Sequence, residues 1–266
     1  MREFTEAYLD RTRRGMWEDS REALADLSLS DREAVLDVGA GTGEFSAVLA
    51  DGVRSGTRVV ALDADPGLLA RAREAGRPVV VGDATRLPVR TDAFDLVTCQ
   101  ALLVNLPEPG PAVREFARAS RDLVAAVEPH NGDVGVASTV DREAALERRA
   151  REAYLAGVRT DVAPGERVAD LFREAGLSVL GTRRYHHEKR VAPPYDEAAL
   201  RAATRKATGE GLADHEAELR RALSEAEYDT LRADWREMGR EVVAAMRAGE
   251  YERVELVPFD VTVGRV

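Results

Sequence analysis

Three closely spaced glycines and an aspartate form the stretch of this chain best suited to bind a small charged ligand. Gly39, Gly41 and Gly43 follow an apolar run that contains Asp37, and a helix-like pattern begins directly after them. Glycine has no Cβ atom to keep a ligand away from the backbone, and it tolerates positive φ in a tight turn. The unpaired N–H groups at the start of a helix favour a carboxylate or a phosphate. The stretch therefore predicts a strand, a turn and a helix that together bind a small, partly anionic group.

Polar residues also mark the ends of the next strand-like runs. The apolar runs predicted to be the first four strands are residues 35–38, 57–63, 78–82 and 94–100. Asp63 ends the second run, Asp83 follows the third, and Gln100 ends the fourth. A single acid at a strand end is often a helix cap or a turn former, but ligands of parallel α/β sheets bind where successive strands end. The recurrence therefore predicts one pocket at this edge of a sheet.

The elements that must position these residues alternate between strands and helices. Helical patterns cover residues 66–75, 111–120, 139–156 and 165–175, and further strands are expected at 122–128, 177–185 and 253–263. Near-continuous apolar strands separated by helices predict an α/β fold with a doubly wound, mostly parallel, seven-stranded sheet and helices on both faces.

Helical patterns also precede the first strand and separate the last two. Residues 3–28 have a helical pattern that Gly15 divides; it fits a helix packed outside the sheet or a flap over the site. Residues 196–250 are almost entirely helical in pattern, with a capping box from Ser224 to Glu227 and an apolar stripe after it. The expected parts are an N-terminal helical flap at 1–30, an α/β domain at 31–190 plus 251–266, and a helical cap insertion at 191–250.

The charge balance disfavours general binding of nucleic acid. The 266 residues include 48 acidic and 38 basic side chains, for a net charge of −10, and the only lysines are Lys189 and Lys206. Such an acidic surface repels a phosphate backbone. The lysine-poor composition fits either adaptation to high salt or arginine-rich codon usage.

The cysteine and apolar content indicate where the protein works. The single cysteine, Cys99, excludes an intramolecular disulfide and a cysteine-rich zinc site, and we expect it to be a buried strand residue. No apolar run approaches the roughly 20 residues of a membrane-spanning helix, and the first residues lack the apolar core of a signal peptide. We therefore expect a cytoplasmic protein that does not bind membranes. The sequence does not indicate its oligomeric state.

The spacing of the glycines distinguishes between two kinds of nucleotide site. A dinucleotide fingerprint needs G-x-G-x-x-G, whereas residues 39–43 read G-x-G-x-G. Together with Asp37, Asp63, the run Gly82-Asp83-Ala84 with Leu87-Pro88, and residues 94–106, this block resembles the class I S-adenosylmethionine-dependent methyltransferases. The resemblance covers roughly residues 33–185 and looks closest to the small-molecule, type 11-like branch, which implies a Rossmann-like methyltransferase fold.

The resemblance implies a role for each polar position. The backbone of the glycine turn would meet the amino-acid portion of S-adenosyl-L-methionine, and Asp37 would hold its ammonium group. Asp63 would accept both ribose hydroxyls, and Asp83 would accept the exocyclic amine of adenine. The implied cofactor-binding residues are Asp37, Gly39, Ala40, Gly41, Thr42, Gly43, Asp63, Ala64, Asp83, Ala84 and Gln100.

Methyl transfer from a sulfonium is an in-line displacement, so the protein mainly aligns the acceptor and excludes water. A general base is needed only for a protonated acceptor. His130, just beyond the fifth strand, is the candidate base, with a structural loop histidine as the alternative. Tyr8, Trp17 and Asn131 are the candidate residues for binding a small-molecule acceptor.

Two further motifs are set aside. His186 and His187 are adjacent on an expected strand and point to opposite faces, so we expect no metal site there. The Pro-Pro-Tyr run at 193–195 is similar to a motif of methyltransferases that modify nucleobase amino groups, but there it follows the fourth strand and begins with Asp or Asn, whereas here Ala192 precedes it far downstream.

The sequence thus predicts a methyltransferase acting on a small molecule, with the N-terminal helix and the helices of 196–250 closing over the acceptor. An NAD(P)-dependent oxidoreductase is the enzymatic alternative, disfavoured by the glycine spacing. A non-catalytic cofactor-binding or regulatory protein of the same fold is the other alternative, since the sequence does not identify the acceptor residues.

Overall fold

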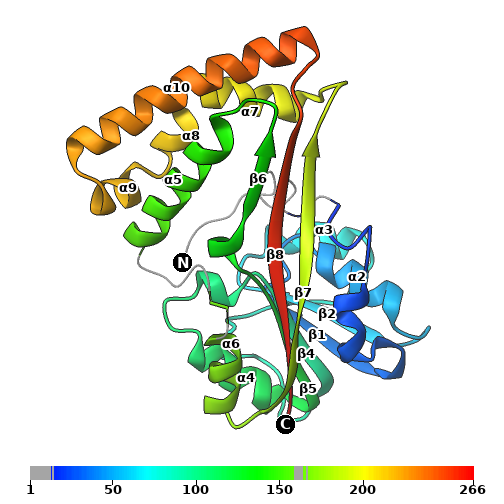
Figure 1. Cartoon of the computed structure of the whole chain (residues 1–266). Helices are drawn as coiled ribbons and strands as arrows, with labels where there is room; N and C mark the ends of the chain where they lie inside the picture. Colours follow the sequence, from blue (N-terminus) through cyan, green and yellow to red (C-terminus); the bar gives the residue numbers. More distant parts are fainter. Residues whose placement is uncertain (1–12, 14, 159–163, 166) are drawn as a thin grey trace. The chain divides into compact units, whose positions relative to one another are not determined.

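The computed structural model describes residues 13, 15–158, 164, 165 and 167–266, and they belong to two compact units (Figure 1). The first, here called the sheet unit, comprises Met1–His130, Ala163–Tyr185 and Pro258–Val266. The second, here called the helical unit, comprises Asn131–Val162 and His186–Val257. The helical unit thus includes residues 131–162, 186–190 and 251–257 in addition to the segment 191–250 expected to form a cap.

A mostly parallel sheet forms the centre of the sheet unit, as predicted. Its strands are β1 (Ala34–Val38), β2 (Arg58–Asp63), β3 (Val79–Val81), β4 (Phe94–Gln100), β5 (Ser120–Pro129), the first part of β7 (Ser178–Val191) and the second part of β8 (Arg253–Arg265). The order is β3-β2-β1-β4-β5-β8, and β7 also pairs with β8. Strands β1 to β5 are parallel, whereas β8 is antiparallel to β5. Val38 is paired with both Leu62 and Cys99, so β1, β2 and β4 end at the same edge.

The predicted number of strands is wrong by one. The described residues contain eight strands, because β6 (Gly135–Ser138) pairs with residues 253–256 of β8 within the helical unit. This segment has four residues, begins with glycine and alternates between exposed and half-buried positions. It therefore lacks the apolar run that marks the other strands.

Helices pack on both faces of the sheet in the sheet unit. They are α2 (Glu44–Gly52), α3 (Leu69–Glu74), α4 (Gly110–Ala119) and α6 (Arg167–Glu174), with 3-10 turns η1 (Glu22–Leu27), η2 (Leu29–Asp31) and η3 (Leu103–Asn105). Phe116 of α4 and Phe172 of α6 pack with Leu36 of β1 on one face. Ala61, on the opposite face of β2, packs against Leu69 of α3. The doubly wound arrangement is confirmed.

Two predicted helix boundaries in this unit are wrong. Residues 15–18 form turns, a bend follows at Asp19, and the short η1 begins at Glu22, so no α-helix runs through residues 15–28 as the pattern predicts. Helix α3 begins at Leu69 rather than at Pro66. The Asp65 carboxylate accepts from the N–H groups of Gly67 (2.7 Å) and Leu68 (3.4 Å), so it stabilises the turn before the helix.

The helical unit has a core of its own. Its helices are α5 (Glu143–Gly157), α7 (Glu197–Thr208), α8 (Glu210–Ala213), α9 (Glu216–Ala222) and α10 (Glu225–Ala248), with a 3-10 turn, η4, at Asn131–Asp133. The capping box of Ser224 and Glu227 is present at the start of α10. The apolar stripe is buried, with Tyr228, Leu231 and Met238 fully enclosed. None of the described helices has the length and apolar composition needed to cross a membrane.

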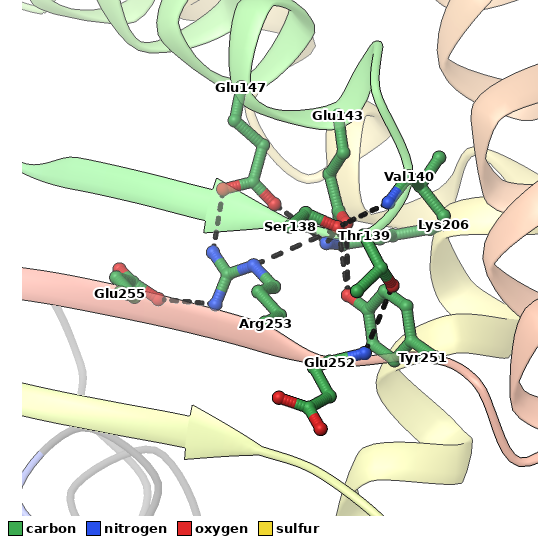
Figure 2. A network of polar contacts seen from close by, with 10 residues as sticks. All are labelled: Ser138, Thr139, Val140, Glu143, Glu147, Lys206, Tyr251, Glu252, Arg253 and Glu255. Atoms are coloured by element: carbon green, nitrogen blue, oxygen red, sulfur yellow. Dashed lines mark hydrogen bonds and ion pairs between the residues drawn. The ribbon is translucent and has the colours of Figure 1, made fainter.

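Beside this core, the helical unit holds a network of buried charges (Figure 2). The Lys206 ammonium group lies against the carboxylates of Glu143 and Glu147, the latter at 2.6 Å. The Arg253 guanidinium group binds Glu147 at 2.6 Å, and the Tyr251 hydroxyl donates to Glu143 at 3.0 Å. Glu143 is fully buried, so its charge is supported by these partners rather than by water.

We predict that Lys206→Met destabilises the helical unit, because it leaves two buried carboxylates with one cation fewer. Breaking a buried ion pair from one side costs about 3–5 kcal/mol. The matched control is Arg205→Met on the same helix, whose ion pairs with Glu210 and Asp214 are exposed and worth about 0.5 kcal/mol. Denaturant unfolding followed by circular dichroism measures both; equal losses would show that the network contributes nothing beyond surface pairs.

Candidate functional site

The glycine turn lies at the carboxyl end of β1, where the sequence predicts it. Gly39, Gly41 and Gly43 have φ of +71°, +56° and +88°, a region that side chains disfavour. The N–H groups of Gly39 and Ala40 donate to the Leu62 carbonyl at 2.7 and 2.9 Å, which ties the turn to β2. Helix α2 starts at Glu44, and no side chain of residues 13, 15–158, 164, 165 and 167–266 caps it. Its first N–H groups are therefore available to an anionic ligand.

At two of these positions, close packing also leaves no room for a side chain. A Cβ atom on Gly39 would lie 2.9 Å from Cδ1 of Leu102, and one on Gly43 would lie 2.8 Å from Cβ of Ala72. Both distances are too short for carbon atoms. The turn thus lies between Ala72 of α3 and the loop after β4.

Asp37 is the buried acid beside this turn. Its side chain is fully enclosed, and its Oδ2 accepts from the Ser46 hydroxyl at 2.5 Å. Among the described residues, no group donates to Oδ1. Burial raises the pKa of Asp37 to about 7, which the Ser46 hydrogen bond opposes. A buried carboxylate oxygen without a donor suits a cationic ligand group such as an ammonium.

Asp63 and Asp83 follow neighbouring strands, as predicted. Asp63 accepts from the N–H of Gly41 at 2.8 Å through Oδ2 and from the N–H of Asp65 at 2.9 Å through Oδ1. Each of its oxygens keeps a second acceptor position for a ligand hydroxyl. Asp83 is exposed, and its Oδ1 accepts from the N–H and the hydroxyl of Thr85, both at 2.8 Å. The bonds shape both loops, which is the turn-forming role that the sequence left open for an acid at a strand end.

Gln100, at the end of β4, is buried and held by an aromatic side chain. Its Oε1 accepts from Nε1 of Trp17 at 2.9 Å. The Trp17 ring stacks on Tyr185 with centroids 4.4 Å apart. The Tyr185 hydroxyl accepts from the backbone N–H of Trp17. Trp17 is 3% exposed, so in this structure it fixes Gln100 from within the core. Its expected contact with an acceptor stays a prediction, and Tyr8 lies outside the described residues.

The other predicted cofactor positions lie on the same three loops. Thr42 is buried, and its hydroxyl donates to the Glu44 carboxylate at 2.6 Å. Ala64 is exposed directly after β2, and Ala84 is half-buried beside Asp83. The sheet unit therefore brings the predicted cofactor-binding residues to one edge of the sheet.

His130 follows β5 and belongs to a charged cluster in the sheet unit. Its Nδ1 lies 3.4 Å from Oδ2 of Asp260 and 3.1 Å from Nη2 of Arg184. Arg184 also binds Asp260 through two bonds, Nε to Oδ1 at 2.7 Å and Nη2 to Oδ2 at 3.0 Å. Burial opposes the charge of Asp260, but the Arg184 bonds keep its pKa below the usual range. Asn131 belongs to the helical unit and is half-buried there.

Glu128 is a functional candidate that sequence reasoning did not select. This residue of β5 is 1% exposed, and its carboxylate accepts from backbone N–H groups of the loop after β4. In the sequence, Glu128 is recognisable only as an acid at the end of an apolar strand. Its backbone hydrogen-bond partners are 24 to 26 residues away, so the sequence does not show them. Among the described residues, no group of three His, Cys, Asp or Glu side chains is arranged to hold a metal ion.

Comparisons with known proteins agree with this geometry. Residues 36–122 match the family model described as a methyltransferase domain. A demethylmenaquinone methyltransferase from Mycobacterium sp. (strain KMS) is 39% identical over 101 residues, which are 38% of this chain and 43% of that protein. The same enzyme from Mycolicibacterium vanbaalenii is 41% identical over 102 residues, 38% of this chain and 42% of that one. The matches thus span less than half of these curated relatives.

Solved structures share the fold. A candidate methyltransferase from Bacillus halodurans C-125 has a TM-score of 0.52 at 18% identity, over 92% of this chain and 98% of that chain. An S-adenosylmethionine-dependent methyltransferase from Aquifex aeolicus has a TM-score of 0.50 at 17% identity, over 68% of this chain and 92% of that chain.

We predict that Asp37 makes the protein less stable as the pH rises through neutrality. Its pKa is raised in the folded state, so the protonated form is favoured there, and the associated stability is lost as pH rises through about 7. Between about pH 5.5 and about pH 8.5, the free energy of unfolding of the wild type should fall by about 2 kcal/mol relative to that of Asp37→Asn. Denaturant titrations across this range measure the difference. Glu128 is present in both proteins, so its own titration cancels; parallel curves would show that Asp37 ionises normally.

Proposed function

We propose that the chain contains a class I S-adenosylmethionine-dependent methyltransferase domain and transfers the methyl group of S-adenosyl-L-methionine to a small-molecule acceptor. The observation that carries the proposal is that, within the described part of the chain, Oδ1 of Asp37 has no hydrogen-bond partner and no side chain caps the neighbouring start of α2. The head group of an amino acid has an ammonium group that can donate to Asp37 and a carboxylate that can accept from the N–H groups at the start of α2.

The residues of the sheet unit fit the rest of this cofactor. Asp63 keeps acceptor positions for the two ribose hydroxyls, and its bond to the Gly41 N–H fixes where they would lie. Asp83 would accept from the exocyclic amine of adenine, with the Ala84 N–H beside it. Gln100, fixed by Trp17, would face the cofactor from the end of β4.

The chemistry required of the chain is mainly positioning. The sulfonium supplies an activated methyl carbon, so the protein aligns the acceptor and excludes water, which can account for roughly 7–11 kcal/mol of the barrier. We infer that His130 accepts a proton where the acceptor is protonated. When Nδ1 of His130 carries the proton and donates to Asp260, Nε2 is the basic ring nitrogen. When Nδ1 instead accepts from Arg184, the proton lies on Nε2.

The acceptor itself is proposed only as a class. The curated relatives are named for methylation of demethylmenaquinone. The family match ends at residue 122, before His130 and the whole helical unit. The similarity therefore supports the methyl donor and does not extend to residues that select an acceptor. The acidic net charge of −10 supports a small molecule rather than a nucleic acid.

We predict that S-adenosylhomocysteine binds and that NAD does not. Asp63→Ala and Gly41→Val should each weaken S-adenosylhomocysteine at least about tenfold, since the first removes the hydroxyl acceptor and the second strains a turn residue with φ of +56°. Calorimetric titration measures both, with Asp51→Ala, an exposed acid of α2, as the control. Micromolar binding of NAD without binding of S-adenosylhomocysteine would contradict the proposal, and normal binding by both variants would contradict the site.

Catalysis is tested by product formation. A labelled-methyl screen over small-metabolite extracts separates an enzyme from a non-catalytic binding protein and identifies the acceptor. With that acceptor, His130→Gln should lower kcat by roughly two to four orders of magnitude if the attacking atom carries a proton, while S-adenosylhomocysteine affinity stays within about twofold. Unchanged turnover with such an acceptor would make His130 a structural residue.

A further inference from the structure

The Glu128 carboxylate holds three consecutive backbone N–H groups of one loop. Its Oε1 accepts from Leu102 at 3.1 Å and from Leu103 at 2.9 Å, and its Oε2 accepts from Val104 at 3.1 Å. These N–H groups open the 3-10 turn η3, where they have no partner within the turn itself. One buried side chain therefore determines the position of the 101–105 loop.

The chain needs such support because it turns sharply on leaving β4. Gln100 is still paired with Val127 of β5, and the next residue, Ala101, has φ of +50°. A non-glycine residue in this region is strained. The Ala101 N–H donates to the Val127 carbonyl at 2.8 Å, and the Asn105 side chain donates to the Ala101 carbonyl at 2.8 Å. The loop is thus fastened at the end of β5, next to Glu128.

The loop in turn contacts the glycine turn. The position that a Cβ atom of Gly39 would take lies 2.9 Å from Cδ1 and 3.1 Å from Cδ2 of Leu102. Leu102 therefore packs directly on the backbone of Gly39. A continuous path of contacts leads from the Glu128 carboxylate through Leu102 to the turn at which the cofactor is proposed to bind.

We propose that Glu128 is a positioning residue for the cofactor site, acting through Leu102 and Gly39 rather than by touching the ligand. Burial of this carboxylate is unfavourable and raises its pKa to about 7, whereas the three N–H donors favour the charged form. A carboxylate at position 128 has two oxygens, and both can accept from buried N–H groups that water does not reach. The inference rests on the proposed function only for the choice of probe ligand.

Glu128→Gln tests this role with little change in shape. The amide retains one acceptor oxygen, but its NH₂ group faces at least one backbone N–H, so a buried donor is left unpaired. We expect S-adenosylhomocysteine to bind about tenfold more weakly and Glu128→Ala to bind more weakly still. Leu102→Ala, which leaves the carboxylate bonds intact and removes the contact to Gly39, should also weaken binding.

Asp95→Asn is the matched control. Asp95 is also buried, and its carboxylate accepts from the N–H groups of Glu33 at 2.6 Å and Ala34 at 3.1 Å, but at the opposite end of β1. Both amide variants should lower the unfolding midpoint, and only Glu128→Gln should weaken S-adenosylhomocysteine. Equal weakening by the two variants, or normal affinity of Glu128→Gln, would overturn the proposal.

Hydrogen exchange gives a readout that does not depend on the ligand. In the free protein, Glu128→Gln should speed exchange at the N–H groups of Leu102 to Val104 and at Gly39, relative to Asp95→Asn. If the wild type does not bind S-adenosylhomocysteine, the proposed function fails, and exchange still decides whether Glu128 positions the turn. Unchanged exchange at Gly39 would show that Glu128 positions the 101–105 loop but not the glycine turn.

Discussion

Backbone N–H groups need acceptors where parallel strands end, because the sheet supplies carbonyl partners for only some of them there. In the sheet unit, carboxylates supply many of these acceptors. Asp63 binds the N–H of Gly41 and of Asp65, Asp83 binds that of Thr85, and Glu128 binds three in the 101–105 loop. Hydrogen bonds to acidic side chains therefore hold the loops at the edge of the sheet where a ligand is proposed to bind. These bonds act together with the backbone bonds of Gly39 and Ala40 to the Leu62 carbonyl, which tie the glycine turn to β2.

The same acids carry an electrostatic cost. Burial raises the pKa of Asp37 and of Glu128 to about 7, so each is close to losing its charge at neutral pH. The two differ in what balances that cost. Glu128 accepts from three backbone N–H groups and from the Cys99 thiol, whereas Asp37 has the Ser46 hydroxyl on one oxygen and no donor among the described residues on the other. A cationic ligand group would supply the missing donor, which makes Asp37 the acid most dependent on a ligand.

Local patterns predicted most of the sheet unit and the glycine turn. Apolar runs located β1 to β5, and the spacing of glycines and acids placed Asp37, Asp63 and Asp83 at one edge of the sheet. What failed depends on contacts that are distant in sequence or on very short segments. Four residues of β6 give too little pattern, and Trp17 was placed by its tertiary contacts with Gln100 and Tyr185 rather than by helical periodicity. Glu128 could not be selected, because an acid in an apolar strand acquires a role only once its partners in another loop are known.

The helical unit shows why the acceptor is harder to infer than the donor. Its core packs around Tyr228, and Glu143 is bound within the same unit by the Tyr251 hydroxyl and the Lys206 ammonium group. The described bonds that shape the glycine turn all lie within the sheet unit. Substitutions in the helical unit therefore leave the described bonds of the turn in place. The proposed methyl donor and acceptor would thus place separate demands on the chain: the cofactor would fix residue types at strand ends, whereas an acceptor would constrain side chains whose types follow no common spacing.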